Sequence, residues 1–159
     1  MLRSSLFVLF TRIISGDRVV LARQGTAENL NKMGLYDMAF VYLKDFWKDE
    51  VSLVPDAGDW EGDVEPFFSN RVRSFASCFV NEMRFGACTN YRGKGYSYAY
   101  IDDGVPVKIQ YIFQATHLRR DPTKDDLTTT FAFVQRFLPD ATVFPWHTRY
   151  ANIYDIFTC

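Results

Sequence analysis

The sequence is poor in the residues and motifs from which catalytic centres are most often built. Of its 159 residues, 2 are histidine and 3 are cysteine. It contains no phosphate-binding glycine loop, no Gly-x-Gly-x-x-Gly, no Gly-x-Ser-x-Gly and no His-Glu-x-x-His. Composition alone allows a Cys-His-Asp arrangement, but no cysteine lies in a recognisable nucleophile turn. We therefore expect no enzyme activity, no catalytic residue and no cofactor.

The few cysteines and histidines also match no common metal-binding spacing. A zinc set is conceivable by residue type alone, from Cys78, Cys88, His117 and His147. We expect instead that His117 lies in a solvated loop, since two arginines follow it closely, and that His147 packs or hydrogen-bonds beside Trp146. The sequence thus predicts no bound metal.

Long apolar runs and glycosylation acceptors are absent as well. No run approaches the ~18 residues that a membrane helix needs, and no Asn-x-Ser/Thr occurs. The odd cysteine count, without a recognisable secretory signal, is typical of a reducing compartment, so we expect an intracellular protein that does not enter a membrane. The apolar run Leu6 to Phe10 is short for a signal core. It fits either a transit peptide or a strand at a domain edge whose partners are missing from this chain.

Aromatic residues are abundant. They make up 17% of the chain, with 15 Phe, 9 Tyr and 3 Trp. Aromatic side chains favour strands and bury much apolar area per residue, so the chain is able to form a substantial core. At this length we expect one domain, with or without an N-terminal extension.

Charge is balanced in total but uneven along the chain. The net charge is −1, which does not point to nucleic acid or membrane. The stretch Lys44 to Pro66 is rich in Asp and Glu, whereas Arg71 to Ile101 has Glu82 as its single acid and five cations: Arg71, Arg73, Arg84, Arg92 and Lys94. Two interpretations stay open: two solvated faces, or a basic patch for an acidic partner with the acidic stretch as an internal competitor. These five cations are the candidate binding residues.

The first half of the chain reads as a strand followed by a helix. Asp17 to Ala22 has strand character, and Thr26 is placed to cap a helix. An apolar stripe at helical spacing follows, although a strand over Met38 to Leu43 is the alternative: Met33, Tyr36, Phe40, Leu43 and Trp47. Residues 54–70 carry Pro, Gly and acids and read as a linker. We therefore divide the chain into an N-terminal extension or domain edge (1–53), this linker and a β-rich module (71–159).

The clearest local signal is a β-hairpin. Tyr96 to Ile101 and Val105 to Phe113 flank Asp103-Gly104, and Asp-Gly between alternating runs is a strong hairpin cue. A two-residue turn pairs three tyrosines with apolar residues on one buried face: Tyr100 with Val107, Tyr98 with Ile109, and Tyr96 with Tyr111. The five cations are few and the acidic stretch competes with them, so we expect any nucleic-acid binding to be weak. Because the tyrosines are then in the core, we also expect it to lack base specificity.

Two short matches to nucleic-acid enzymes and binders overlap this hairpin. Lys94 to Ile101 resembles the octamer of RNA recognition motifs, but there a helix follows and here a strand does. Tyr100-Ile101-Asp102-Asp103 matches the metal-binding hairpin of reverse transcriptases, which needs a much larger palm domain. We expect a hairpin turn, with no catalytic metal at Asp102 or Asp103.

Further strands are expected at Thr128 to Phe137 and Ile153 to Phe157, whereas the stretch from Arg71 to Phe85 fits either a helix or strands. From about residue 85 to the end, the chain resembles the C-terminal domain of proteins encoded by fungal transposons of the Kyakuja–Dileera–Zisupton and Plavaka type. The resemblance rests on Phe85-Gly86, the strand Ser97 to Ile101, the run Val105 to His117, the strand TFAFVQRFLP and a Pro-Trp segment.

That resemblance implies a bromo-adjacent homology (BAH)-like domain, which is a protein- and chromatin-binding module. No nuclease core is visible upstream, so the chain is expected to be a noncatalytic, transposon-derived remnant with a protein or chromatin partner in the nucleus. The expected fold is mainly β with some α (α+β): a small antiparallel sheet or partly closed BAH-like barrel after an N-terminal helical or extended segment. The alternative is a weak nucleic-acid-binding fragment that uses the basic cluster Arg71–Lys94.

Overall fold

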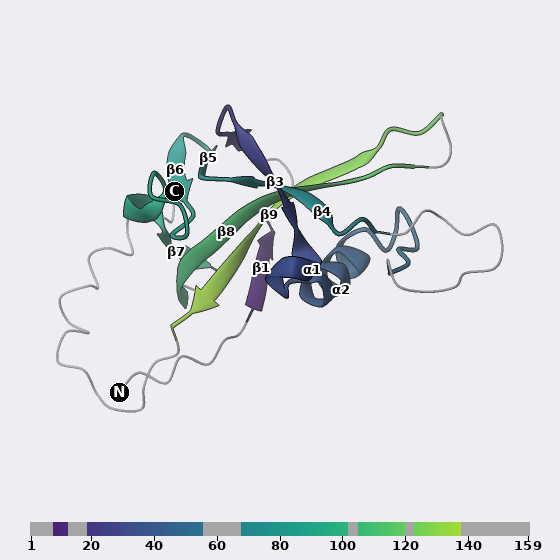
Figure 1. Cartoon of the computed structure of the whole chain (residues 1–159), viewed down its shortest axis with the longest axis horizontal. Coiled ribbons are helices and arrows are strands. Elements are labelled where there is room, and N and C mark those ends of the chain that lie inside the picture. Colours follow the sequence, from purple (N-terminus) through teal and green to yellow (C-terminus); the bar gives the residue numbers. More distant parts are fainter. Residues whose placement is uncertain (1–7, 13–18, 56–67, 102–104, 120–122, 138–159) are drawn as a thin grey trace.

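The computed structural model describes residues 8–12, 19–55, 68–101, 105–119 and 123–137 (Figure 1). The elements follow one another in the order β1 (Val8–Arg12), β2 (Val19–Leu21), β3 (Gly25–Asn29), α1 (Leu30–Met33), α2 (Tyr36–Phe46), β4 (Arg71–Phe75), β5 (Ser77–Val80), β6 (Met83–Gly86), the 3-10 turn η1 (Lys94–Tyr96), β7 (Tyr98–Ile101), β8 (Val105–His117) and β9 (Leu127–Arg136). None of the described helices is long and apolar enough to span a membrane.

The strands form two antiparallel sheets. The larger is six-stranded, with the order β1-β9-β8-β4-β3 and with β7 added to the edge of β8; the smaller is three-stranded, with the order β2-β5-β6. This arrangement confirms the expected α+β class with antiparallel sheets. Strand β1 pairs with β9 over its whole length, so the N-terminal strand has its partner within this chain, contrary to the missing-partner interpretation.

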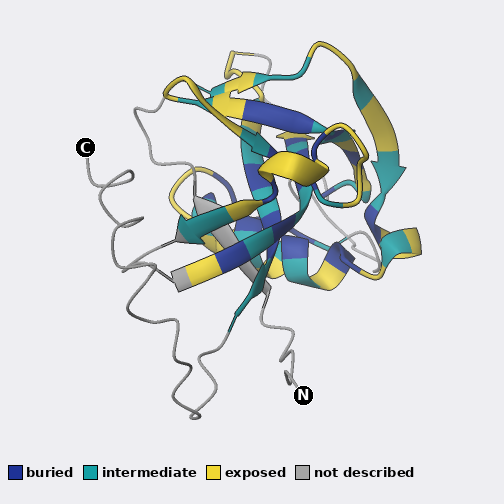
Figure 2. Ribbon diagram, turned by 90° about the vertical axis from the view of Figure 1, so that its left-hand side faces the viewer, coloured by how far each residue is buried: buried dark blue, intermediate teal, exposed yellow. Residues whose placement is uncertain are grey.

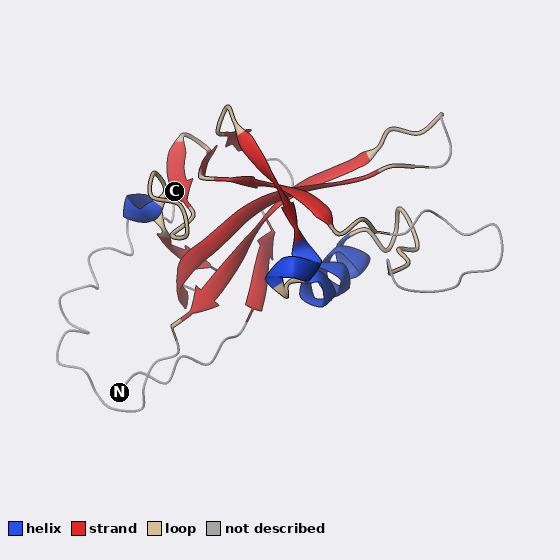
Figure 3. Cartoon of the chain, in the orientation of Figure 1, coloured by secondary structure: helices blue, strands red, loops and turns tan. Residues whose placement is uncertain are grey.

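The large sheet is covered on both faces. Along β8, Phe113 and Ala115 belong to a core cluster with the helices, whereas Ile112 belongs to a second cluster with Cys78 of the small sheet. This alternation follows from the two-residue period of a strand. We call the two sides the helix face and the small-sheet face. Figure 3 shows α1 and α2 together beside the large sheet.

The predicted helical segment is confirmed, but the residue predicted to cap its start is wrong. Tyr36, Leu43 and Trp47 of the predicted stripe are buried in the first cluster, and Met33 and Phe40 pack against it. Thr26 does not cap a helix, because it lies on β3 opposite Ser74. The cap is Asn29, whose side chain accepts a hydrogen bond from the Lys32 amide at 3.1 Å.

The helix is also divided in two. Gly34 ends α1 in the left-handed conformation (φ 69), which a glycine adopts without steric cost. The chain then continues into α2, and the apolar stripe carries on across the break.

The hairpin pairing is confirmed, but its register is wrong by one residue. Tyr98 pairs with Lys108 and Ala99 with Val107, while the predicted turn residues 102–104 lie outside the described residues. The small-sheet face of β7 packs into the second cluster, where Ala99 fits beside Val107. Tyr98 therefore points to the opposite face, where it is 64% exposed. Tyr96 is not on this strand at all, because it ends η1.

His117 also differs from its prediction. It ends β8, is buried, and lies with its ring 6.1 Å from that of Trp47. The cause is long-range: β8 continues with β9 as far as the pair His117–Leu127, which places this residue on the helix face. His147, Trp146 and the strand expected at Ile153 to Phe157 lie outside the described residues.

The linker and extension are joined to the rest of the sheet. Val54 and Phe68 flank the central part of the predicted linker, and the Phe68 amide donates to the Val54 carbonyl at 2.8 Å. Residues of the predicted extension supply β1, β3 and both helices to the sheet and core that also contain β8 and β9. The stretch from Arg71 to Phe85 forms strands, namely β4, β5 and most of β6.

Candidate aromatic and cationic binding surface

The five cations predicted as a cluster lie in two separate places. Arg71 and Arg73 are on β4 of the large sheet. Arg84 is on β6 of the small sheet, Arg92 is in the following loop and Lys94 begins η1. The second group adjoins exposed tyrosines, which gives it the features of a binding surface.

Arg84 and Tyr96 form the first half of this surface. The Arg84 guanidinium lies 4.5 Å from the centre of the Tyr96 ring, and Tyr96 is 49% exposed. Arg84 also donates a hydrogen bond to the Arg92 carbonyl at 3.4 Å, which ties β6 to the loop. A guanidinium over an aromatic face is attracted by the ring quadrupole, so this pair holds a cation and a flat apolar ring together at the surface.

Tyr98 and Lys108 form the second half. The Lys108 ammonium lies 5.9 Å from the centre of the Tyr98 ring. On the same ring, Phe137 is stacked at 6.2 Å between centroids and 20° between planes. Because Tyr96 and Tyr98 are two residues apart, their Cα atoms are within about 7 Å of each other. We call Arg84, Arg92, Lys94, Tyr96, Tyr98 and Lys108 the aromatic–cationic surface.

Buried backbone contacts fix the position of this surface. Between the two tyrosines, Ser97 is 1% exposed, and its hydroxyl donates to the Lys94 carbonyl at 2.9 Å. The Ser97 carbonyl accepts from the Ile109 amide at 2.7 Å, which joins η1 to β8. Its two neighbours are exposed: Tyr96 beside Arg84 of the small sheet, and Tyr98 beside Lys108 of the large sheet. Figure 2, viewed from this side, shows the short helical turn and adjoining loop as exposed.

The local charge of the surface is positive although the chain as a whole is slightly negative. In the sequence from 68 to 101, Glu82 is the single acid, and Asp102 and Asp103 follow outside the described residues. Exposed rings can stack on bases, and nearby cations can contact phosphates, in a way that tolerates any base sequence. The surface is thus chemically suited to a flexible polyanion with flat apolar groups.

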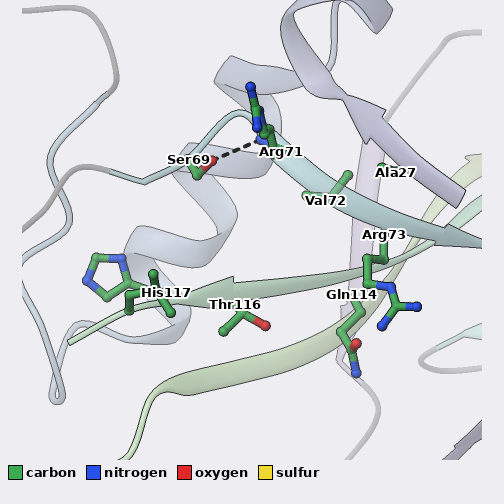
Figure 4. Close-up of a pocket in the computed structure, with 9 residues that line it drawn as sticks. Ala27, Ser69, Arg71, Val72, Arg73, Gln114, Thr116 and His117 are labelled. Atoms are coloured by element: carbon green, nitrogen blue, oxygen red, sulfur yellow. Dashed lines mark hydrogen bonds between the residues drawn. The ribbon is translucent and has the colours of Figure 1, made fainter. Parts of the chain in front are cut away.

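A separate cavity of about 500 Å³ lies between β4 and β8 (Figure 4). It is lined by Ala27, Ser69, Arg71, Val72, Arg73, Gln114, Thr116, His117 and Leu118. The other two predicted cations, Arg71 and Arg73, are therefore at this cavity rather than on the aromatic–cationic surface.

The two described cysteines are not arranged as a metal site. Cys78 is buried in the second core cluster, and burial raises the pKa of its thiol to about 11. Cys88 donates from Sγ to Oε1 of Gln110 at 3.1 Å. Among the described residues, no group of three or more His, Cys, Asp or Glu side chains is placed to hold a metal ion. Asp102 and Asp103 lie outside that part of the chain.

The comparisons with protein-family models, curated proteins and solved structures found no match. The sequence predicted Arg84, Arg92 and Lys94 as binding residues, but not Tyr96, Tyr98 or Lys108. Tyr96 and Tyr98 were assigned to the core, whereas in the structure Tyr96 ends η1 and Tyr98 lies directly opposite Lys108.

Proposed function

We propose that this protein is a noncatalytic module that binds single-stranded nucleic acid through the aromatic–cationic surface. The observation that carries the proposal is Tyr98, a strand residue that is 64% exposed, with Phe137 stacked against its ring and the Lys108 ammonium 5.9 Å from the ring centre. A large exposed ring held in one orientation gives a base a surface to stack on. The weak binding expected from the sequence rested in part on burial of this ring, and that part of the reason no longer applies.

Single strands fit this surface better than duplexes. Stacking on a protein ring requires an unpaired base face, and each such contact contributes about 1–3 kcal/mol by alanine substitution. Four cations adjoin the rings, which limits the phosphate contacts to about four and the slope of log affinity against log salt to about −3 for a single strand. We therefore expect moderate affinity in dilute buffer, weakening strongly with added salt.

As part of the same proposal, this module derives from a transposon protein of the kind that residues 85 to 159 resemble. A BAH-like module that had lost its nuclease would work by binding, in the nucleus, on or near chromatin.

The test is fluorescence anisotropy of labelled single-stranded and duplex oligonucleotides of matched length, in both DNA and RNA. We expect Tyr98→Ala to weaken single-strand binding about tenfold or more and Tyr98→Phe to retain it, because the phenyl face is kept. Val41→Ala is the matched control, since Val41 is 67% exposed on α2. Equal affinity for duplex and single strand, with no effect of Tyr98→Ala, would contradict the proposal.

A further inference from the structure

The cavity beside Arg71 and Arg73 arises where two paired strands separate. β4 and β8 pair at three positions, the last of which is Arg73 with Gln114. From this pair toward the start of β4, β4 continues to pair with β3 as far as Arg71–Asn29. From the same pair toward the end of β8, β8 continues to pair with β9 as far as His117–Leu127. Two strands that follow different neighbours leave a wedge between them, and the cavity fills this wedge (Figure 4).

The wedge has an apolar wall and a size suited to a small molecule. Ala27, Val72 and Leu118 line it, and the buried His117 lies at its inner side. Its volume of about 500 Å³ falls within the range of roughly 300–1,000 Å³ that is usual for ligand pockets. Such pockets combine an apolar lining with a few polar groups that orient the ligand.

The polar groups at the wedge are cationic. Arg71 and Arg73 are both exposed and alternate with the buried Val72, so they share the small-sheet face of β4. Among the described residues, the ion pairs are Lys48–Asp45 and Arg119–Glu50, and neither involves these two arginines.

An amide completes this set of polar groups. Gln114 lies directly opposite Arg73, so its side chain is on the same face. Figure 4 shows the Arg73 and Gln114 side chains extending in the same direction from neighbouring strands.

The wedge is distinct from the aromatic–cationic surface. Lys108 and Gln114 are six residues apart on β8, which corresponds to about 20 Å along a strand. They also lie on opposite faces, because the strand is irregular between Ile109 and Tyr111. As a result Ile109 and Ile112 share the second core cluster; Gln114 follows Ile112 by two residues, whereas Lys108 precedes Ile109 by one. One nucleotide cannot contact both places.

We propose that the wedge binds a small organic anion, with a carboxylate or phosphate group on Arg71, Arg73 and Gln114 and a short apolar body against Ala27, which pairs with Arg73, and Leu118. Arginine fits this role because its planar fork makes paired, charge-assisted hydrogen bonds to carboxylate and phosphate oxygens. The apolar body replaces water on the wall of the cavity. Nothing in this proposal depends on nucleic-acid binding.

The experiment titrates the full chain with phenyl phosphate, benzoate, inorganic phosphate and neutral benzyl alcohol, followed by ¹H–¹⁵N NMR and calorimetry. We expect one or both aromatic anions to bind and to shift the amides of Arg73, Gln114 and His117. Which of them binds more tightly decides between phosphate and carboxylate as the preferred group. Benzyl alcohol should not bind.

Variants make the test specific. The double change Arg71→Gln and Arg73→Gln should weaken the binding of the aromatic anions about tenfold or more. It should leave oligonucleotide binding unchanged. Arg84→Gln, at another exposed arginine, on β6, should leave the binding of the anions unchanged. Leu118→Ala should weaken the binding of phenyl phosphate but not that of inorganic phosphate. This comparison can be made even if the double variant does not fold. No binding of either anion at millimolar concentration, or equal loss in Arg84→Gln, would overturn the proposal.

Discussion

At the residue scale, the exposure of Tyr98 depends on a one-residue shift of the β7–β8 register. In the register expected from an Asp-Gly turn, this tyrosine lies opposite Ile109 in the core. In the structure, Ile101 pairs with Val105, and Tyr98 lies opposite Lys108 on the outer face. Since side chains alternate along a strand, a shift of one exchanges the two faces completely. A single ring thus changes from a core residue to a candidate ligand contact.

Cys78 gives a residue-scale prediction about pH. Burial raises the pKa of its thiol from 9.0 to about 11, so the folded chain holds this proton more tightly than the unfolded chain. Its contribution to stability is complete below pH 9 and is lost as the pH rises toward 11. By about pH 10 this loss amounts to about 1 kcal/mol.

The measurement is urea unfolding of the wild type and of Cys78→Ala at about pH 8 and about pH 10. Other groups titrate in the same interval, so the informative quantity is the difference between the two proteins. We expect the wild type to lose more unfolding free energy than the variant over this interval. Parallel losses would show that the thiol does not titrate as its burial requires.

At the scale of elements, the position of η1 depends on the close approach of two backbone segments. A side chain on Gly93 would meet the backbone of Ala76 and Ala87, and one on Gly86 would meet the backbone of Gly93. These contacts hold the loop before η1 against β6 and the start of β5. The exposed tyrosines are positioned on the outer side of this packed loop.

We therefore expect Gly93→Ala to lower the unfolding free energy by about 1–3 kcal/mol, because backbone atoms cannot move aside as a flexible side chain can. Oligonucleotide affinity should fall as well, since η1 carries Lys94 and Tyr96. Gly95→Ala is the control, because a Cβ there meets nothing within 4 Å. Thermal denaturation of the three proteins checks the first expectation, and equal melting temperatures for both variants would refute it.

Elements with strong local periodicity were predictable from the sequence. The stripe through Tyr36, Leu43 and Trp47 predicted α2, and alternation predicted that residues near Tyr98 and Lys108 would pair. Register was not predictable, because it depends on which face of β7 the small sheet covers. The burial of His117 was not predictable either, because it follows from pairing with Leu127 across a charged connection.

The candidate site was predictable only in part, for the same reason. Basic residues between Arg71 and Lys94 stand out in the sequence, but their division between two sites depends on how β4 and β6 are placed in different sheets. Tyr96 and Tyr98 were visible as a motif and were assigned to the core by local alternation. A tyrosine on a strand is either core or surface, and only the tertiary packing decides.

At the scale of the whole molecule, the sheet unites segments that are far apart in the sequence. Its edges are β1 and β3 from the first 29 residues, and its centre is β8 and β9. The helix-face cluster likewise joins Leu43 with Phe113 and Phe131. On this sheet, Lys108 of the aromatic–cationic surface and Gln114 of the wedge are about 20 Å apart along β8.

The most direct test of the account is a ¹H–¹⁵N NMR titration of the full chain with a single-stranded oligothymidylate of about eight nucleotides, a length within the usual site sizes. We predict that shifts concentrate at Arg84, at η1, at Tyr98 and at Lys108. The amides of α2 and those of Arg71 and Arg73 should stay unchanged. Absence of shifts in dilute buffer at excess oligonucleotide, or shifts centred on α2 or the wedge, would contradict the claim that this surface binds single strands.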